Sequence, residues 1–148
     1  AFVRLGWRER AHELLAFFLD GRRPAAWNQW PEVVHREAKQ PRFVGDMPHG
    51  WIASDYIRAA LDLFVYERER DDALVLAAGV PPAWLDRAGV TVRDLRTLFG
   101  RVSYSLKGER ARVVLHVAGD AAPPGGFVFA WPGAERHFHT LPATVIVE

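Results

Sequence analysis

Apolar residues in the first part of the chain recur at helical spacing. Over residues 7–20 they include Trp7, Ala11 and Phe18, which lie four and seven residues apart, on one face of an α-helix. A second pattern of the same period covers residues 52–67, where apolar groups occupy most of the helix circumference. A helix this apolar is normally packed on several sides. The sequence therefore predicts a helical hairpin over residues 1–70.

The period changes to two after residue 70. Over residues 101–107 three apolar residues alternate with polar ones, which is typical of a half-buried strand. Proline and glycine clusters separate the other apolar runs. Strands are also expected at residues 74–77, 90–95, 112–117, 127–131 and 144–147. The predicted fold class is α+β, with a helical hairpin followed by a small antiparallel β-sandwich over residues 71–148.

Charge and composition exclude several classes of partner. The 148 residues include 19 basic and 18 acidic side chains, so the net charge of +1 gives no reason to expect nucleic acid. No run of about 18 apolar residues is present, and no membrane span is expected. Cysteine is absent, which excludes disulfides and thiolate metal sites. The chain opens at Ala1 without a signal-peptide pattern, which suggests a processed or excised piece.

The two predicted helices carry more apolar surface than one helix can cover for the other. Burial of one large apolar side chain contributes about 1.5–3 kcal/mol, so this surface needs a partner. A sheet could cover one side, and the other side needs another domain, another subunit or further sequence. We therefore expect an exposed apolar patch, or a homo-oligomer formed through the exposed helix faces.

The connection over residues 21–51 holds the densest group of polar and aromatic residues. Tryptophan faces that stack on sugar rings, beside amides and carboxylates that bind hydroxyl groups, are suited to carbohydrate. The candidate substrate-binding residues are Trp27, Asn28, Gln29, Trp30, Asp46, His49 and Trp51. The alternative is that the tryptophans hold the connection against the helices while Asp46 caps the next helix.

No catalytic residue can be assigned from spacing alone. Asp46 is the best single carboxylate, followed by Glu32, Glu37 and Asp55, but no spacing selects the pair that a glycosidase needs.

A metal site is not expected. His137 and His139 would face the same way on a strand, as two metal ligands can, but the sequence indicates no third ligand. The sequence predicts neither a metal ion nor another cofactor.

Three sequence stretches carry a resemblance to a known family. They are GDMPHGWIASDYIRAALDLFVYE at residues 45–67, DDALVLAAGVPPAWLD at 71–86 and VTVRDLRTLFGRVSYSLKG at 90–108. In order and spacing, the chain over residues 1–118 resembles the C-terminal part of bacterial six-hairpin, (α/α)6-barrel glycosidase-like proteins, of the kind labelled coagulation factor 5/8 type domain proteins. Residues 119–148 match no family pattern.

The resemblance implies a role in a larger carbohydrate-active protein. The hairpin would be the last of the barrel, residues 71–148 an accessory domain, and the connection over residues 21–51 would face the sugar pocket. The general acid would lie in earlier hairpins, so this chain alone would be inactive. No family motif assigns Asp46 a catalytic role. The alternatives are a freestanding carbohydrate-binding module and a protein-interaction domain.

Overall fold

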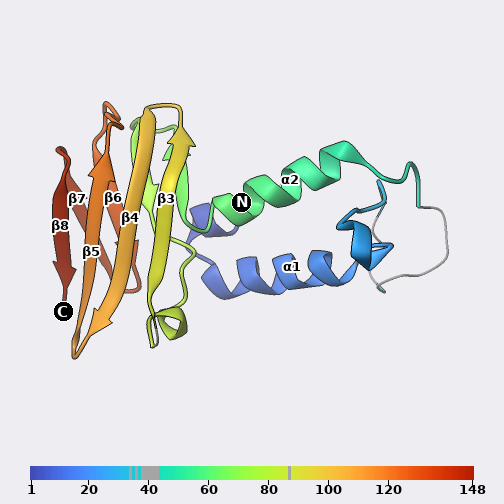
Figure 1. Ribbon diagram of the computed structural model, residues 1–148, viewed down its shortest axis with the longest axis horizontal. Coiled ribbons are helices and arrows are strands. Elements are labelled where there is room, and N and C mark those ends of the chain that lie inside the picture. The colour runs from blue at the N-terminus through green and yellow to red at the C-terminus, as the bar shows by residue number, and fades with distance from the viewer. Residues whose placement is uncertain (34, 36, 38–43, 87) are drawn as a thin grey trace. The chain divides into compact units, whose positions relative to one another are not determined.

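The chain folds into two compact units, Ala1–Asp62 and Leu63–Glu148. The computed structural model describes residues 1–33, 35, 37, 44–86 and 88–148 (Figure 1). The boundary between the units follows Asp62, whereas the change of period in the sequence predicts it at residue 70.

The first unit is a pair of helices with a long connection. Helix α1 spans Arg8–Asp20 and helix α2 spans Gly50–Leu61, with short 3₁₀ turns at Val3–Leu5 (η1) and Ala25–Trp27 (η2). Asp62 ends this unit and accepts hydrogen bonds from the guanidinium groups of Arg4, at 3.2 Å, and Arg58, at 3.1 Å. These ion pairs tie the start of the unit to the end of α2.

The second helix is shorter than its apolar pattern predicts. Helix α2 ends at Leu61, and the expectation that it continues to residue 67 is wrong because Val65–Arg68 forms strand β1. Strand β1 pairs antiparallel with Ala73–Leu76, strand β2. The β-branched and aromatic side chains of Val65 and Tyr66 favour a strand where a partner is available.

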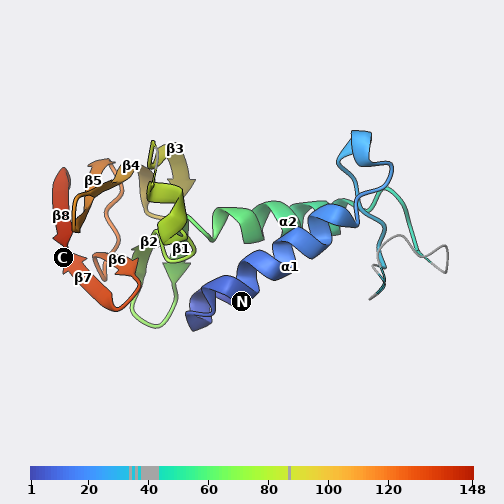
Figure 2. The ribbon, with the colours of Figure 1, turned by 90° about the horizontal axis from the view of Figure 1, so that it is seen from below.

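The second unit is a sandwich of two four-stranded sheets, which Figure 2 shows as two layers. One sheet has the order β1-β2-β6-β7 and the other β3-β4-β5-β8. A 3₁₀ turn, η3, spans Pro82–Leu85. The remaining strands are β3 (Val90–Thr97), β4 (Gly100–Glu109), β5 (Arg112–Gly119), β6 (Phe127–Trp131), β7 (Ala134–Phe138) and β8 (Ala143–Val147).

A closed apolar core includes residues from both sheets. Leu74 and Phe129 come from one sheet and Leu106 and Leu115 from the other, and all four are fully buried. Tyr104 is buried with them, and its hydroxyl group donates a 3.1 Å hydrogen bond to the carbonyl oxygen of Phe64. Burial of alternate residues along β4 confirms the period-two prediction for this strand.

The predicted α+β class is confirmed, with two differences in the sheets. Strands β2 and β6 pair in parallel, whereas all the other paired strands in the described residues are antiparallel. Strand β7 was not predicted because its sequence, AERHF, shows little apolar alternation. Neither described helix has the length and apolar character needed to cross a bilayer.

Candidate functional site

The two ends of the connection between α1 and α2 are joined by backbone hydrogen bonds. The Glu32 N–H donates to the Asp46 carbonyl at 2.9 Å, and the His49 N–H donates to the Trp30 carbonyl, also at 2.9 Å. Such bonds fix the approach of two segments that are distant in sequence. They bring three of the candidate polar side chains to one place.

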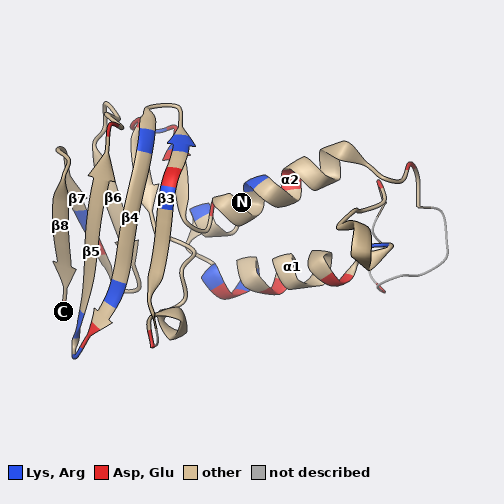
Figure 3. Ribbon diagram, viewed as in Figure 1, with Lys and Arg blue, Asp and Glu red and all other residues tan. Residues whose placement is uncertain are grey.

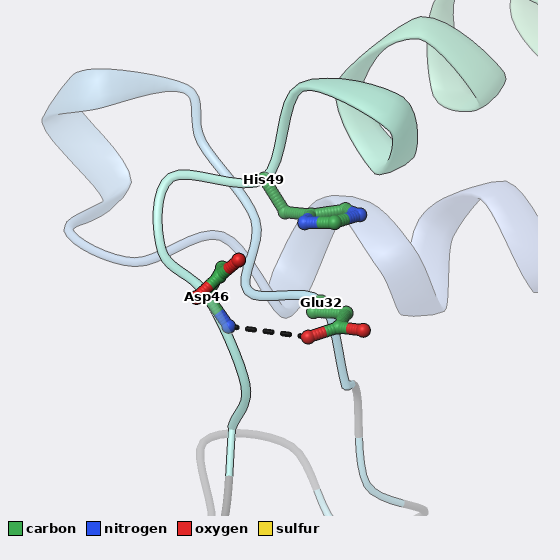
Figure 4. A group of neighbouring side chains, drawn as sticks. All are labelled: Glu32, Asp46 and His49. Carbon is green, nitrogen blue, oxygen red and sulfur yellow. Dashed lines mark hydrogen bonds between the residues drawn. The ribbon is translucent and has the colours of Figure 1, made fainter.

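Glu32, Asp46 and His49 form the central group of this region, here called the loop cluster (Figure 4). Each offers one carboxylate oxygen or ring nitrogen, and these three atoms all lie within 4.8 Å of one another. The Oε2 atom of Glu32 also accepts a 3.3 Å hydrogen bond from the Asp46 N–H. Both carboxylates are exposed and the imidazole is half-buried. Among the described residues, no basic side chain forms an ion pair with either carboxylate.

Gly45 permits the close contact between the two arms of the connection. Its φ is +67°, in the left-handed region that favours glycine. A Cβ atom at this position would lie 2.3 Å from Oε2 and 2.7 Å from Cβ of Glu32. Any larger residue at this position would therefore clash with the Glu32 side chain.

Trp30 has a structural position. It is 4% exposed, its ring stacks on Tyr56 with centroids 4.5 Å apart, and its indole N–H donates to the Phe18 carbonyl at 2.6 Å. The ring therefore holds the connection against both helices, and its faces are not accessible to a ligand. Trp30 therefore fits the alternative interpretation of the sequence, in which a tryptophan anchors the connection to the helices.

Trp27 and Trp51 are highly exposed, at 64% and 80%. The Trp51 ring meets the His49 ring edge to face, with centroids 5.7 Å apart, so it borders the loop cluster. Trp27 belongs to η2, on the other arm of the connection, and no described ring contact joins it to Trp51. Both rings offer an apolar face of the kind that stacks on a sugar.

Asn28 and Gln29 are held by interactions within their own arm. Asn28 has a left-handed backbone, and its side-chain oxygen accepts a hydrogen bond from the Arg22 guanidinium. The Gln29 carbonyl accepts a 3.0 Å bond from the Arg23 N–H, and its side chain is half-buried. The structure thus gathers Asp46, His49 and Trp51 and leaves Trp27, Asn28 and Gln29 on the other arm.

Glu32 is the member of the loop cluster that the sequence offered only as a secondary carboxylate candidate and not as a binding residue. It ranked behind Asp46 as a carboxylate candidate, and the 13 residues between them carry no periodic signal. Only the pairing of the two arms places them together. In the second unit, Nε2 of His137 lies 3.5 Å from a carboxylate oxygen of Glu135. Among the described residues, the loop cluster is the only group of three potential metal ligands.

An apolar groove of about 240 Å³ runs between the two helices of the first unit. It includes Leu14, Leu15 and Phe18 of α1 and Ile52, Tyr56 and Ala59 of α2. Asp55 also lines the groove, and Figure 3 shows how few charged residues α2 carries.

Comparison of the chain with protein-family models, with curated proteins and with solved structures gives no match. The function is therefore inferred from the residues and their geometry.

Proposed function

We propose that this chain is the C-terminal part of a carbohydrate-active protein of the glycoside hydrolase type. In this proposal α1 and α2 belong to the wall of a helical barrel, and the sandwich of β1–β8 is an accessory domain. The exposure of the helix faces carries the proposal. Only Ala11 is buried on α1, and α2 has no buried residue, although both helices are amphipathic or largely apolar. Faces of this kind normally pack against further protein.

The loop cluster and the two exposed tryptophans of the connection supply the proposed sugar contacts. Trp27 and Trp51 offer planar apolar faces, and the carboxylates of Glu32 and Asp46 can accept hydrogen bonds from hydroxyl groups. His49 adds a group that donates or accepts according to its tautomer. A few polar groups beside exposed aromatic rings are typical of carbohydrate-binding surfaces.

The exposure of the carboxylates argues for binding by this chain rather than for catalysis. A glycosidase acid needs a raised pKa, which usually comes from an apolar pocket, and a second carboxylate about 5–10 Å away. Glu32 and Asp46 are both exposed to solvent. We therefore place the general acid of the whole protein in other hairpins.

The first test compares this chain with a longer protein that contains the further helical hairpins that the proposal requires. The longer protein should release sugar from members of a broad glycan panel, and the 148-residue chain should release none. Trp51→Ala in the longer protein should raise KM more than it lowers kcat, because stacking contributes mainly to binding. Trp84→Ala, which removes an exposed tryptophan of the second unit, is the matched control. A longer protein with an intact barrel and no activity on the panel would contradict the proposal.

The second candidate function is a freestanding carbohydrate-binding module, favoured by the exposure of Trp27 and Trp51. The two functions differ in what the chain does alone. Titration of tryptophan fluorescence with oligosaccharides should show saturable binding for a module and no change for a barrel wall. Saturable binding that Trp51→Ala abolishes and Trp84→Ala preserves would favour the module.

A further inference from the structure

We propose that Glu32, Asp46 and His49 bind one divalent transition-metal ion, with Zn²⁺ as the representative ion. This proposal does not depend on the carbohydrate function. Its basis is the convergence of two carboxylates and one imidazole, from two arms of the connection, on one exposed position (Figure 4).

The separation of the donor atoms suits a single ion after small side-chain movements. Zinc–ligand distances are about 2.0–2.2 Å, so ligand atoms around one zinc ion lie about 3.4 Å apart in a tetrahedral arrangement. The three donor atoms of the loop cluster are at most 4.8 Å apart. Both carboxylates are exposed, so rotation about their side-chain bonds can close the difference without backbone movement.

The backbone beneath the three side chains is already fixed. Glu32 and Asp46 are joined by the 2.9 Å bond between their main chains, and the His49 N–H is bonded to the carbonyl of buried Trp30. Gly45 lets the two arms approach closely enough for Glu32 to reach Asp46. A backbone that is already in place leaves only the three side chains to be ordered on binding, which favours affinity.

The charges and the donor types favour a cation of this class. Two neighbouring carboxylates repel each other, and no basic side chain among the described residues forms an ion pair with them. A divalent ion between them would replace this repulsion with attraction. The imidazole selects zinc and related ions over Mg²⁺ and Ca²⁺, which prefer oxygen ligands only. Three protein ligands leave the fourth position to water.

Isothermal titration of the 148-residue chain with zinc chloride at neutral pH tests the site. One equivalent should bind, and Mg²⁺ at the same concentration should not compete. Glu32→Gln, Asp46→Asn and His49→Gln should each raise the Kd for Zn²⁺ at least about tenfold, because each removes one of three ligands.

Two control variants separate this site from other histidines and carboxylates. His137→Gln/His139→Gln removes the histidine pair of the second unit, and Asp55→Asn removes a carboxylate of α2 outside the loop cluster. Both should leave the Kd unchanged. Absence of zinc binding at millimolar concentration would overturn the proposal, as would binding that only the His137/His139 variant abolishes.

A measurement on the unsubstituted chain guards against variants that fail to fold. Co²⁺ should broaden the NMR signals of His49, Asp46 and Trp51 before those of His137, because paramagnetic broadening falls steeply with distance from the ion. Broadening centred on His137 or His116 would place the ion elsewhere and overturn the assignment.

Discussion

The two units of this protein differ in how far they bury their apolar side chains. In the second unit Leu74, Leu76, Phe127 and Phe129 are at most 1% exposed, inside a core shared by both sheets. In the first unit, helices α1 and α2 together bury only Ala11. Among the described residues, nine large apolar side chains of the first unit are exposed, against three in the second.

The difference follows from the number of layers in each unit. Two sheets face each other, so each covers the apolar face of the other. In a pair of helices, each helix covers only the face of its partner that points toward it. The apolar residues of α2 extend beyond one such face, so α1 cannot cover all of them. The second unit therefore encloses its apolar core, whereas the helix pair leaves nearly all of its apolar residues exposed or half-buried.

The largest expected effect comes from a substitution that creates a cavity in the core of the sandwich. Phe129→Ala should lower the free energy of unfolding by about 3–5 kcal/mol, because it removes a fully buried ring. Urea denaturation followed by far-UV circular dichroism measures the effect. The matched variant in the helix pair, Ile57→Ala, removes a side chain that is 59% exposed and should cost under about 1 kcal/mol. Equal losses from the two variants would contradict the comparison.

Trp30 is the strongest anchor of the first unit. Trp30→Ala should destabilise that unit by about 3 kcal/mol, since the ring is buried and its N–H group is hydrogen-bonded. Faster amide hydrogen exchange in α1 and α2, with unchanged exchange in the sandwich strands, is the expected result. Trp27→Ala is the matched control because that ring is exposed, and it should leave exchange unchanged.

The hydrogen bond of Tyr104 should make a smaller contribution to the sandwich. Tyr104→Phe removes the donor to the Phe64 carbonyl and should lower the free energy of unfolding by about 1 kcal/mol. Urea denaturation at neutral pH measures this loss. Tyr56→Phe is the control, because Tyr56 belongs to the first unit and should leave the sandwich unchanged.

The burial of Tyr104 predicts that the stability of the sandwich falls at alkaline pH. Burial raises the pKa of Tyr104 well above its usual range, while a tyrosine in the unfolded chain ionises near pH 10. The unfolded chain therefore loses its proton first as the pH rises. The contribution of Tyr104 should be intact below about pH 10 and should decline above it, and Tyr104→Phe should remove this part of the decline. Urea denaturation of both proteins at several pH values between 8 and 11 measures the free energy of unfolding that this comparison requires.

The exposed helix faces should influence association more than stability. Leu14→Ser and Ile57→Ser should change the free energy of unfolding by about 1 kcal/mol or less, because both side chains are exposed. They should nevertheless reduce binding of the dye ANS and any concentration-dependent light scattering. A chain that stays monomeric at all concentrations and binds no ANS would argue that these faces need no partner.

The sequence was informative wherever neighbouring residues set a period. It predicted both helices, the strands around Tyr104 and the α+β class, because side-chain spacing along one element determines which face is apolar. It extended α2 to residue 67 because Val65 and Tyr66 fit an apolar helix as well as a strand. Pairing with β2 decides between the two, and that pairing is not visible in a local pattern.

The candidate site was predicted in part. Aromatic and acidic composition drew attention to the connection, and the structure does place Asp46, His49 and Trp51 in one region. Composition could not separate exposed Trp51 from buried Trp30, since both are tryptophans of the same segment. Their different roles come from what each ring meets in the folded unit.

By itself, the sequence determined the element types, the alternation of buried and exposed residues and the excess of apolar surface on the helices. The tertiary structure decided the parallel pairing of β2 with β6, the burial of Trp30 and the meeting of Glu32 with Asp46. The physical reason is the range of the interactions. Periodicity arises from residues a few positions apart, whereas these contacts join distant segments whose approach depends on the closure and packing of a whole unit.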